Sequence, residues 1–477
     1  MEAMNTEEFR KYAHQLVDWM ADYFADVENL PVTPDMQPGD IYAKIPEKPP
    51  NESEAFDQIF ADFKDKIMPG MSHWQSPNWF AYFPANSSKP SVLAEMLTAT
   101  LGTQGMIWLT SPAATELEER MMEWLRQMIG LPAGFTGVIQ DTASTATLVA
   151  LLTAREKFTS WNINRKGFTK QPFTIYSSSQ VHSSIDKAVK IAGFGEENLR
   201  KIPVDEDFAL LPDQLENAIK NDLKSGKKPL AVISALGTTS STAIDPIRAI
   251  GEICQKYGIW HHIDAAFAGT ALLLPEKRWM NDGAELADSF VFNPHKWMLV
   301  NFDCSAYFVK DPQSLVRTFS ITPEYLKTNQ DQVVKNYRDW GIQLGRRFRS
   351  LKLWFVIRSY GVEGLQKMLR HHLKMARWFE QQIDNSEDFE KLAPVPLNTI
   401  CFRYHPSHIE QEHILNSLNQ MLIEKLNETR RVFFTQTKLD DKFTIRMVIG
   451  QTEVQERHVE AAWQLIQETA RSLPDVN

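Results

Sequence analysis

Apolar side chains recur at every third or fourth position near the start of the chain, a spacing that predicts an amphipathic helix over residues 5 to 24. The apolar positions of this helix are Phe9, Tyr12, Leu16, Met20, Tyr23 and Phe24. Asn5 and Glu8 have capping-box spacing at its start. The proline-rich stretches "LPVTPDMQPGD" and "KIPEKPPNES" favour extended backbone. Residues 1–85 are therefore predicted to form a helical and extended arm that packs on another body, with a partner subunit as the candidate.

Between residues 86 and 360, short apolar runs of β-like composition alternate with runs of helical period. In chain order they are "FTIYSSS", "DQLENAIKNDLKSG", "LAVISALGTTS", "IRAIGEICQKYG", "IWHHIDAAFAG" and "SFVFNPHKW". This alternation predicts a large α/β domain with a mostly parallel sheet and helical crossovers. Ligands of such sheets bind beyond the carboxyl ends of the strands, so functional residues are expected there.

The pattern changes again over residues 361–477. A long helix, "VEGLQKMLRHHLKMARWFEQQI", is followed by a strand near "TICFRYH", a further helix and a hairpin in "RVFFTQTKLDDKFTIRMVIG". A last helix is expected at the end, with Thr452 and Gln455 as its capping box. These elements predict a small C-terminal α+β domain.

Length and composition narrow the class of protein. A chain of 477 residues is long enough for two or three structural units around a buried site. Its 51 Lys and Arg and 60 Asp and Glu form no long block of one sign, so no nucleic-acid partner is expected. The start lacks the order of a secretory signal, and no apolar run has the length of a membrane span. With only three cysteines, the chain is expected to be cytoplasmic and without a membrane partner.

The segment "CFRYHPSHIEQEH" gathers four potential zinc ligands: Cys401, His405, His408 and His413. Strand alternation directs Cys401 and its neighbours to opposite faces, and the segment continues through a proline turn into a helix. No metal site is therefore predicted. Two histidine doublets are each interpreted as one inward and one outward side chain without chemistry: His261-His262 and His371-His372.

Three polar features fall where strands of the predicted sheet end. Asp264 closes the strand in "HIDAAFAG", and Lys296 follows another strand in "FNPHKW". Thr142, Ser144 and Thr145 stand at a helix start in "GVIQDTASTATLVALL", where free N–H groups suit a phosphate. Lys296 lies in an apolar run, and burial lowers a lysine pKa from its usual value of about 10.4, which makes the amine a nucleophile toward an aldehyde.

Aldehyde capture, a phosphate cradle and an acid beside a heteroaromatic nitrogen together describe a site for pyridoxal 5'-phosphate. Taken singly, each feature has a simpler interpretation, because lysines at strand ends often reach to the surface and small polar residues often cap helices. The occurrence of all three in one α/β domain, in the order phosphate loop, Asp264, Lys296, favours the cofactor site.

The chain resembles the group II pyridoxal-phosphate-dependent amino-acid decarboxylases, in particular the aromatic L-amino-acid decarboxylase branch. The motifs that carry the resemblance are "AYFPANSS", "SPAATELE", "IQDTASTATLVALL", "HIDAAFAG", "NPHKWMLVNFDCSA", "YLK" and "LGRRFRSLKLWFV". It implies the aspartate aminotransferase fold (fold type I), a homodimer with active sites shared at the subunit interface, and release of carbon dioxide from an amino acid to leave an amine.

The resemblance also implies roles for individual residues. Lys296 would form the Schiff base with the cofactor, Asp264 would pair with the pyridine nitrogen, and His182 in "SSQVHSS" would stack on the ring. Tyr325, in a polar stretch that matches the family's mobile loop, would help to return a proton to the product. The other implied cofactor contacts are Ala143, Ser144, Thr239, Ala266, Asn293 and His295.

The family's substrate-pocket positions fall on Trp74, Tyr82, Phe83, Pro84 and Ala85, with Gln104 and Met106 expected from the partner chain. An aromatic wall selects a flat ring, because a carboxylate side chain would need a buried cation to offset its dehydration. Gly345 in "QLGRRF" leaves room for an indole, whereas Ala85 lacks the hydroxyl that animal relatives carry there. Tryptophan, tyrosine and phenylalanine are the expected substrates, with DOPA as a further candidate.

Three other functions remain alternatives. An aromatic aldehyde synthase uses the same scaffold, but plant enzymes of that kind carry Phe at the Tyr325 position and insect ones Asn at the His182 position, and this chain has neither. A catalytically silent binding protein is disfavoured by the intact Lys296, Asp264 and His182. Ordinary transamination keeps the cofactor, but the match at Tyr325 favours decarboxylation.

Overall fold

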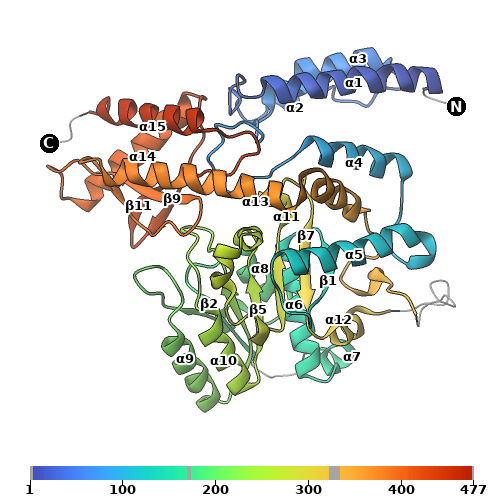
Figure 1. Ribbon diagram of the computed structural model, residues 1–477, viewed down its shortest axis with the longest axis vertical. Helices are drawn as coiled ribbons and strands as arrows, with labels where there is room; N and C mark the ends of the chain where they lie inside the picture. The colour runs from blue at the N-terminus through green and yellow to red at the C-terminus, as the bar shows by residue number, and fades with distance from the viewer. Residues whose placement is uncertain (1–3, 169–172, 322–332, 475–477) are drawn as a thin grey trace.

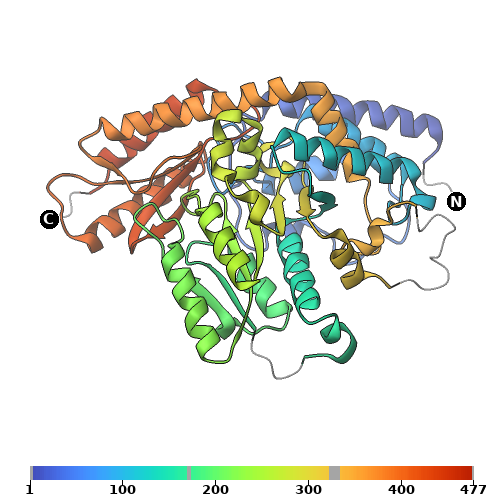
Figure 2. The same ribbon diagram turned by 60° about the horizontal axis from the view of Figure 1, so that its bottom comes forward.

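The computed structural model describes residues 4–168, 173–321 and 333–474 (Figure 1). Within these ranges lie a seven-stranded sheet flanked by helices and a separate four-stranded sheet. The long helix α13 (Arg349–Asp384) runs along both parts, and the N-terminal helices lie at one edge of the molecule (Figures 1 and 2).

The large sheet has the strand order β1-β7-β6-β5-β4-β2-β3. Only β7 runs against its neighbours, while the pairs between β6 and β3 are parallel. The predicted α/β fold with a mostly parallel sheet is therefore confirmed. The strands are β1 (Thr136–Gln140), β2 (Phe173–Ser178), β3 (Leu199–Ile202), β4 (Lys228–Ala235), β5 (Trp260–Asp264), β6 (Ser289–Phe292) and β7 (Ser305–Val309).

Helices cover this sheet and connect its strands. Their apolar sides close a core in which β4 and β6 are buried along most or all of their length, as expected for strands with helices on both faces. The helices of this region are α5 (Pro112–Met128), α6 (Ala143–Phe158), α7 (Asn162–Lys166), α8 (Ser184–Ile191), α9 (Pro212–Lys224), α10 (Ile247–Tyr257), α11 (Pro294–Trp297) and α12 (Pro312–Phe319).

Within α13, Gly361 leaves helical geometry with φ 65° and ψ 171°. A positive φ of this size suits glycine, so this residue permits a sharp break between two helical segments. The small sheet is antiparallel, with the order β10-β11-β9-β8, and includes the predicted hairpin. Its elements are β8 (Phe389–Lys391), β9 (Thr399–Tyr404), α14 (Glu412–Glu428), β10 (Thr435–Leu439), β11 (Lys442–Val448) and α15 (Glu456–Arg471).

The expected cap of the last helix is wrong in one respect. Gln455, not Thr452, is the N-cap of α15, and it forms the capping box with His458. The Thr452 hydroxyl instead donates to the backbone oxygen of Ser87 at 3.0 Å. Thr452 thus connects the C-terminal part to the segment before α4 (Lys89–Leu101) and does not start a helix.

The N-terminal segment contains α1 (Thr6–Asp26), α2 (Asp40–Lys44), α3 (Phe56–Asp62) and α4 (Lys89–Leu101). The capping box of Asn5 and Glu8 is present, and α1 buries none of its residues in this chain. Farther along, Val32, Trp79 and Phe80 are buried, and Trp79 pairs with Phe433 of the C-terminal part. The division at residues 85 and 360 stays a prediction, and part of the proposed arm already packs on its own chain.

Candidate active site

A cavity of about 230 Å³ opens beyond the carboxyl ends of β4, β5 and β6. Side chains far apart in sequence reach it because each follows a strand of the same sheet edge or begins the helix after one. All nine residues expected to contact the cofactor line this cavity: Ala143, Ser144, His182, Thr239, Asp264, Ala266, Asn293, His295 and Lys296.

The first turn of α6 forms one wall of the cavity. Thr142 is its N-cap, with the hydroxyl oxygen accepting a hydrogen bond from the Thr145 N–H at 3.3 Å. Ala143 and Ser144 follow in the first turn, which contains no acidic residue. Unpaired N–H groups and the positive end of a helix dipole favour a negatively charged group, so a phosphate fits at this wall.

Lys296 lies in the short helix α11, which follows β6 directly. Burial lowers the pKa of its amine to about 8, the nearby Asp264 carboxylate raises it in part, and the Arg446 guanidinium lowers it further. Its Nζ atom lies 5.0 Å from the centre of the Phe83 ring. With such a pKa about a tenth of the molecules carry a neutral, nucleophilic amine at pH 7, against fewer than about one in a thousand for an ordinary lysine.

Asp264 is the last residue of β5 and accepts a hydrogen bond from the Ala266 N–H at 3.0 Å. Burial raises the pKa of its carboxyl group, and the positive charge of Lys296 partly offsets that effect. An acid in such a position can stabilise a protonated ring nitrogen, because the two charges neutralise each other where water is scarce.

His182 follows β2 and lines the same cavity. Its Nδ1 atom accepts a hydrogen bond from the Ser184 N–H at 3.1 Å, so the neutral ring carries its proton on Nε2. Desolvation lowers the pKa of this histidine, and the charge of Lys296 lowers it further. A neutral imidazole suits stacking on a planar cofactor.

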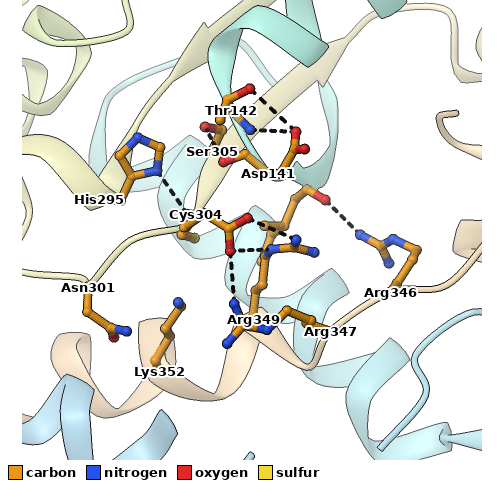
Figure 3. A network of polar contacts seen from close by, with 12 residues as sticks. Asp141, Thr142, His295, Asn301, Cys304, Ser305, Arg346, Arg347, Arg349 and Lys352 are labelled. Atoms are coloured by element: carbon orange, nitrogen blue, oxygen red, sulfur yellow. Dashed lines mark hydrogen bonds and ion pairs between the residues drawn. The ribbon is translucent and has the colours of Figure 1, made fainter. Parts of the chain in front are cut away.

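Two residues that precede Lys296 accept hydrogen bonds from the segment that follows it, and Figure 3 shows the one to His295. The His295 ring accepts a hydrogen bond from the Cys304 N–H at 2.9 Å, and Asn293 accepts one from the Ser305 hydroxyl at 2.7 Å. Burial lowers the pKa of His295 to about 3, so this ring is neutral as well. The segment that follows the lysine thus folds back and fixes the side chains that precede it.

A second cavity of about 460 Å³ adjoins the first and shares Lys296, His182 and four other lining residues with it. Its wall contains all five substrate-pocket residues expected from this chain: Trp74, Tyr82, Phe83, Pro84 and Ala85. Trp74 and Tyr82 stack with ring centres 5.7 Å apart. The wall is aromatic, as expected for a pocket that receives a flat ring.

The other three substrate-pocket residues line neither cavity in this chain. Gln104 Oε1 accepts a hydrogen bond from the Arg346 N–H at 2.6 Å, and a Cβ atom added at Gly345 would lie 3.3 Å from Gln104 Nε2. The Met106 backbone oxygen accepts from the Arg338 N–H. Gln104, Met106 and Gly345 therefore lie on neighbouring segments, whereas Tyr325 lies outside the described residues.

The sequence interpretation missed two residues that line the second cavity, Phe302 and Arg446. Arg446 comes from β11 of the small sheet and is 4 % exposed. Its Nε atom donates to the Ser240 oxygen at 2.8 Å and Nη1 to the Thr435 hydroxyl at 3.1 Å, while Nη2 has no hydrogen-bond partner among the described residues. An arginine amid the apolar residues of "FTIRMVIG" was the available signal.

Clusters of metal ligands and membrane-spanning helices are both lacking among the described residues. No group of three or more His, Cys, Asp or Glu side chains there could hold a metal ion. In the same ranges, none of the helices combines the length and the apolar character needed to cross a membrane.

Comparisons with known proteins agree with this geometry. A family model described as the pyridoxal-dependent decarboxylase conserved domain matches residues 38–405. The chain is 43% identical over 483 residues to phenylacetaldehyde synthase of Arabidopsis thaliana, covering 99% of this chain and 98% of that protein. The crystal structure of Oryza sativa TDC with PLP and tryptamine is 35% identical, with a TM-score of 0.95 and 99% of both chains covered. That of Catharanthus roseus tryptophan decarboxylase in complex with L-tryptophan is 39% identical, with a TM-score of 0.93 and 99% of both chains covered.

Proposed function

Because this chain belongs to the pyridoxal-dependent decarboxylase family, we propose that it converts aromatic L-amino acids to the corresponding amines with release of carbon dioxide. The resemblance inferred from the sequence motifs is confirmed by the family match. The proposal depends on three groups on the walls of two adjoining cavities, one of which is aromatic. They are a neutralisable amine, a buried acid and a buried guanidinium whose Nη2 group has no partner among the described residues.

The residues of the first cavity fit pyridoxal 5'-phosphate. Lys296 would hold its aldehyde carbon, the first turn of α6 its phosphate and Asp264 its ring nitrogen, with His182 against the ring face. When bound, the cofactor supplies a conjugated, positively charged ring that accepts the electron pair left by the departing carboxylate. This chain's residues supply the orientation of the substrate, the exclusion of water and the protons.

Arg446 is the candidate partner for the carboxylate of the amino acid. Its Nη2 group is buried and has no acceptor within the described ranges, and leaving a buried donor unsatisfied costs about 1–3 kcal/mol, more for a charged group. A substrate carboxylate would satisfy it with a charge-assisted hydrogen bond. The same cavity offers Trp74, Tyr82 and Phe83 to the substrate ring.

The substrate class is supported by the named relatives and by this wall. The Catharanthus roseus structure is a complex with L-tryptophan, and the Arabidopsis relative is named for a product with a phenyl ring. We therefore propose tryptophan, tyrosine and phenylalanine as substrates, with DOPA as a further candidate. The test is incubation of purified protein and pyridoxal 5'-phosphate with an amino-acid mixture that includes glutamate and histidine, followed by mass spectrometry. Arylalkylamines support the proposal, whereas an amine from glutamate as the main product contradicts it.

An aromatic aldehyde synthase is the second candidate, because the Arabidopsis relative has that activity in its name. In that reaction oxygen and water are consumed, and aldehyde, carbon dioxide, ammonia and hydrogen peroxide are released. Tyr325 and His182 of this chain favour the amine, and we propose that the Tyr325 hydroxyl delivers the proton to the α-carbon. Peroxide released in step with carbon dioxide would establish the synthase instead. A Tyr325→Phe variant should shift the product toward aldehyde.

We also propose that the protein acts as a cytoplasmic homodimer with shared sites. Support comes from α4, whose Leu93, Leu97 and Leu101 are 53%, 47% and 63% exposed, and from Gln104 and Met106, which follow α4 and line neither cavity of their own chain. The three cysteines are free and buried, as suits a reducing compartment. Light scattering measures the assembly. Mixing Lys296→Ala chains with chains disrupted at Met106 should restore activity in mixed dimers if Met106 serves the partner's site.

A further inference from the structure

The histidine doublet in α13 has one member with an environment that packing alone does not explain. His372 is buried, and its Nδ1 atom accepts a hydrogen bond from the indole N–H of Trp297 at 2.9 Å. The backbone of Gln451 hydrogen-bonds the ring as well. Burial lowers the pKa of this histidine to about 3, so the ring is neutral and can accept at Nδ1. Trp297 directly follows Lys296 in the chain.

Trp297 also begins a stack of rings that returns to the cavity. The Trp297 ring lies 4.9 Å from that of Phe267 with planes 14° apart, and the Phe267 ring lies 4.0 Å from that of Phe83, again at 14°. The Phe83 ring in turn has Lys296 Nζ at 5.0 Å and the Arg446 guanidinium at 5.4 Å. His372 is therefore connected to the Lys296 amine in two ways: through Trp297 and the backbone of α11, and through the stacked rings.

We propose that His372 is a positioning residue, which fixes the Trp297 indole by accepting its N–H and thereby sets where Lys296 and Phe83 lie in the cavity. The hydrogen bond selects one orientation of Trp297, since the indole has a single donor. Without an acceptor at this position the buried N–H would be unsatisfied, and the indole would rotate or shift to find one. Either movement displaces the lysine that precedes it and the ring stack that follows it.

Substitutions of His372 distinguish a role as hydrogen-bond acceptor from a role that only fills space. If volume alone matters, His372→Leu and His372→Asn should be impaired to a similar degree, because both change the packing. If the acceptor matters, His372→Asn should resemble the native protein, since its amide oxygen can take the place of Nδ1, and only His372→Leu should differ. The neighbouring His371 provides matched controls on the same helix, His371→Asn and His371→Leu.

We rest this inference on the proposed function, in which Lys296 is the reactive amine, but the first measurement needs no turnover. Competitive acetylation of the full chain without cofactor, followed by mass spectrometry of the Lys296 peptide across pH, gives the pKa of that lysine. His372→Leu should shift this pKa from the native value and lower kcat/KM about tenfold with cofactor, as expected when a reacting group is displaced by less than 1 Å. His372→Asn and both His371 variants should match the native protein in both readouts.

Trp297→Phe keeps a ring in the stack, removes the donor and serves as a second variant should His372→Leu fail to fold. It should reproduce the shift in the Lys296 pKa. Where His372→Leu folds, adding it to Trp297→Phe should cause little further change, because the two residues act through one bond. A folded His372→Leu or Trp297→Phe with native lysine pKa and native kcat/KM overturns the inference, as does equal impairment of His372→Leu and His372→Asn. A shifted lysine pKa without any decarboxylation would leave the inference standing and remove the proposed function.

Discussion

Arg349 holds the carboxylate of Asp303 with two hydrogen bonds of 3.0 Å, from Nε to Oδ1 and from Nη2 to Oδ2. Burial alone raises the pKa of Asp303, but the hydrogen bond and charge of Arg349 outweigh that effect and lower it. The next residue, Cys304, donates its N–H to His295, beside the reactive lysine. Arg349 and Cys304 are both visible in the network of Figure 3. This ion pair therefore anchors the turn that orients one wall of the cofactor cavity.

Replacing Arg349 with Met should destabilise the protein and weaken cofactor binding together. Removal of one partner from a largely buried ion pair costs about 3 kcal/mol, because the Asp303 charge is then compensated only by the longer contact with Arg347 at 3.3 Å. The measurements are the midpoint of denaturant unfolding and the dissociation constant of pyridoxal 5'-phosphate. Arg370→Met is the matched control, because Arg370 makes the same bidentate contact with Glu276 from the same helix but on the exposed surface. The control should change neither value appreciably.

Replacing Arg446 with Gln should remove the preference for ligands that carry a carboxylate. We expect kcat/KM to fall about 30- to 100-fold, corresponding to the loss of roughly 2–3 kcal/mol of charged hydrogen bonding. The product amine lacks the carboxylate, so its inhibition constant should stay within about twofold of the native value if the variant keeps the shape of the pocket. Competition between the amine and an aromatic amino acid measures both. An equal loss for the amine would show that Arg446 serves packing and not carboxylate recognition.

The order of elements was predictable because its signals are local. The runs that became β2, α9, β4, α10, β5 and β6 each carry their own apolar period, and the rule that parallel strands bind ligands at their carboxyl ends placed Asp264 and Lys296 together. The direction of β7 could not be predicted, because a buried apolar strand has the same sequence pattern whether it runs parallel or antiparallel to its neighbour.

Contacts between segments far apart in the chain could not be predicted from the sequence. Arg446 enters the second cavity from a strand 150 residues beyond Lys296. Its Nη2 group has no hydrogen-bond partner in the part of the chain that the structure describes, which is visible only when the small sheet is in place. The N-cap of α15 was wrongly predicted for the same reason. Thr452 has a suitable side chain for a cap, but its hydroxyl donates to the backbone oxygen of the distant Ser87. Of the His371-His372 doublet, one member is buried and the other partly exposed, yet the partner of the buried one could not be named. The same expectation was wrong for His261-His262, because helices cover both faces of the sheet and both rings are buried.

The pH dependence of cofactor capture should report the lowered pKa of Lys296. Only the neutral amine attacks an aldehyde, so the association rate of pyridoxal 5'-phosphate should rise with pH, with a midpoint near 8, and level off above it. A lysine with its usual pKa of about 10.4 would show no plateau in that range. Stopped-flow absorbance measures the rate. In Asp264→Asn the midpoint should move to lower pH, because the negative charge that raises the lysine pKa is gone. An unchanged midpoint in that variant would show that the Asp264 charge does not influence the pKa of Lys296.

Gly345 lies beside Gln104, which we propose serves the partner's site, so Gly345→Ser should change the choice of substrate there more than the stability of the protein. The backbone at Gly345 is not in the left-handed region, so a side chain is tolerated there, but its Cβ would lie 3.3 Å from Gln104 Nε2. Gln104 is itself held by the Arg346 N–H at 2.6 Å, so the added hydroxymethyl group narrows the space beside this pair. The ratio of kcat/KM for tryptophan to that for tyrosine should then fall about tenfold, within the range that one or two buried atoms produce. Gly364→Ser is the control, since its Cβ would meet only Tyr360 at an ordinary 3.5 Å. A ratio that stays constant in Gly345→Ser would place the indole elsewhere and remove Gly345 from the substrate pocket.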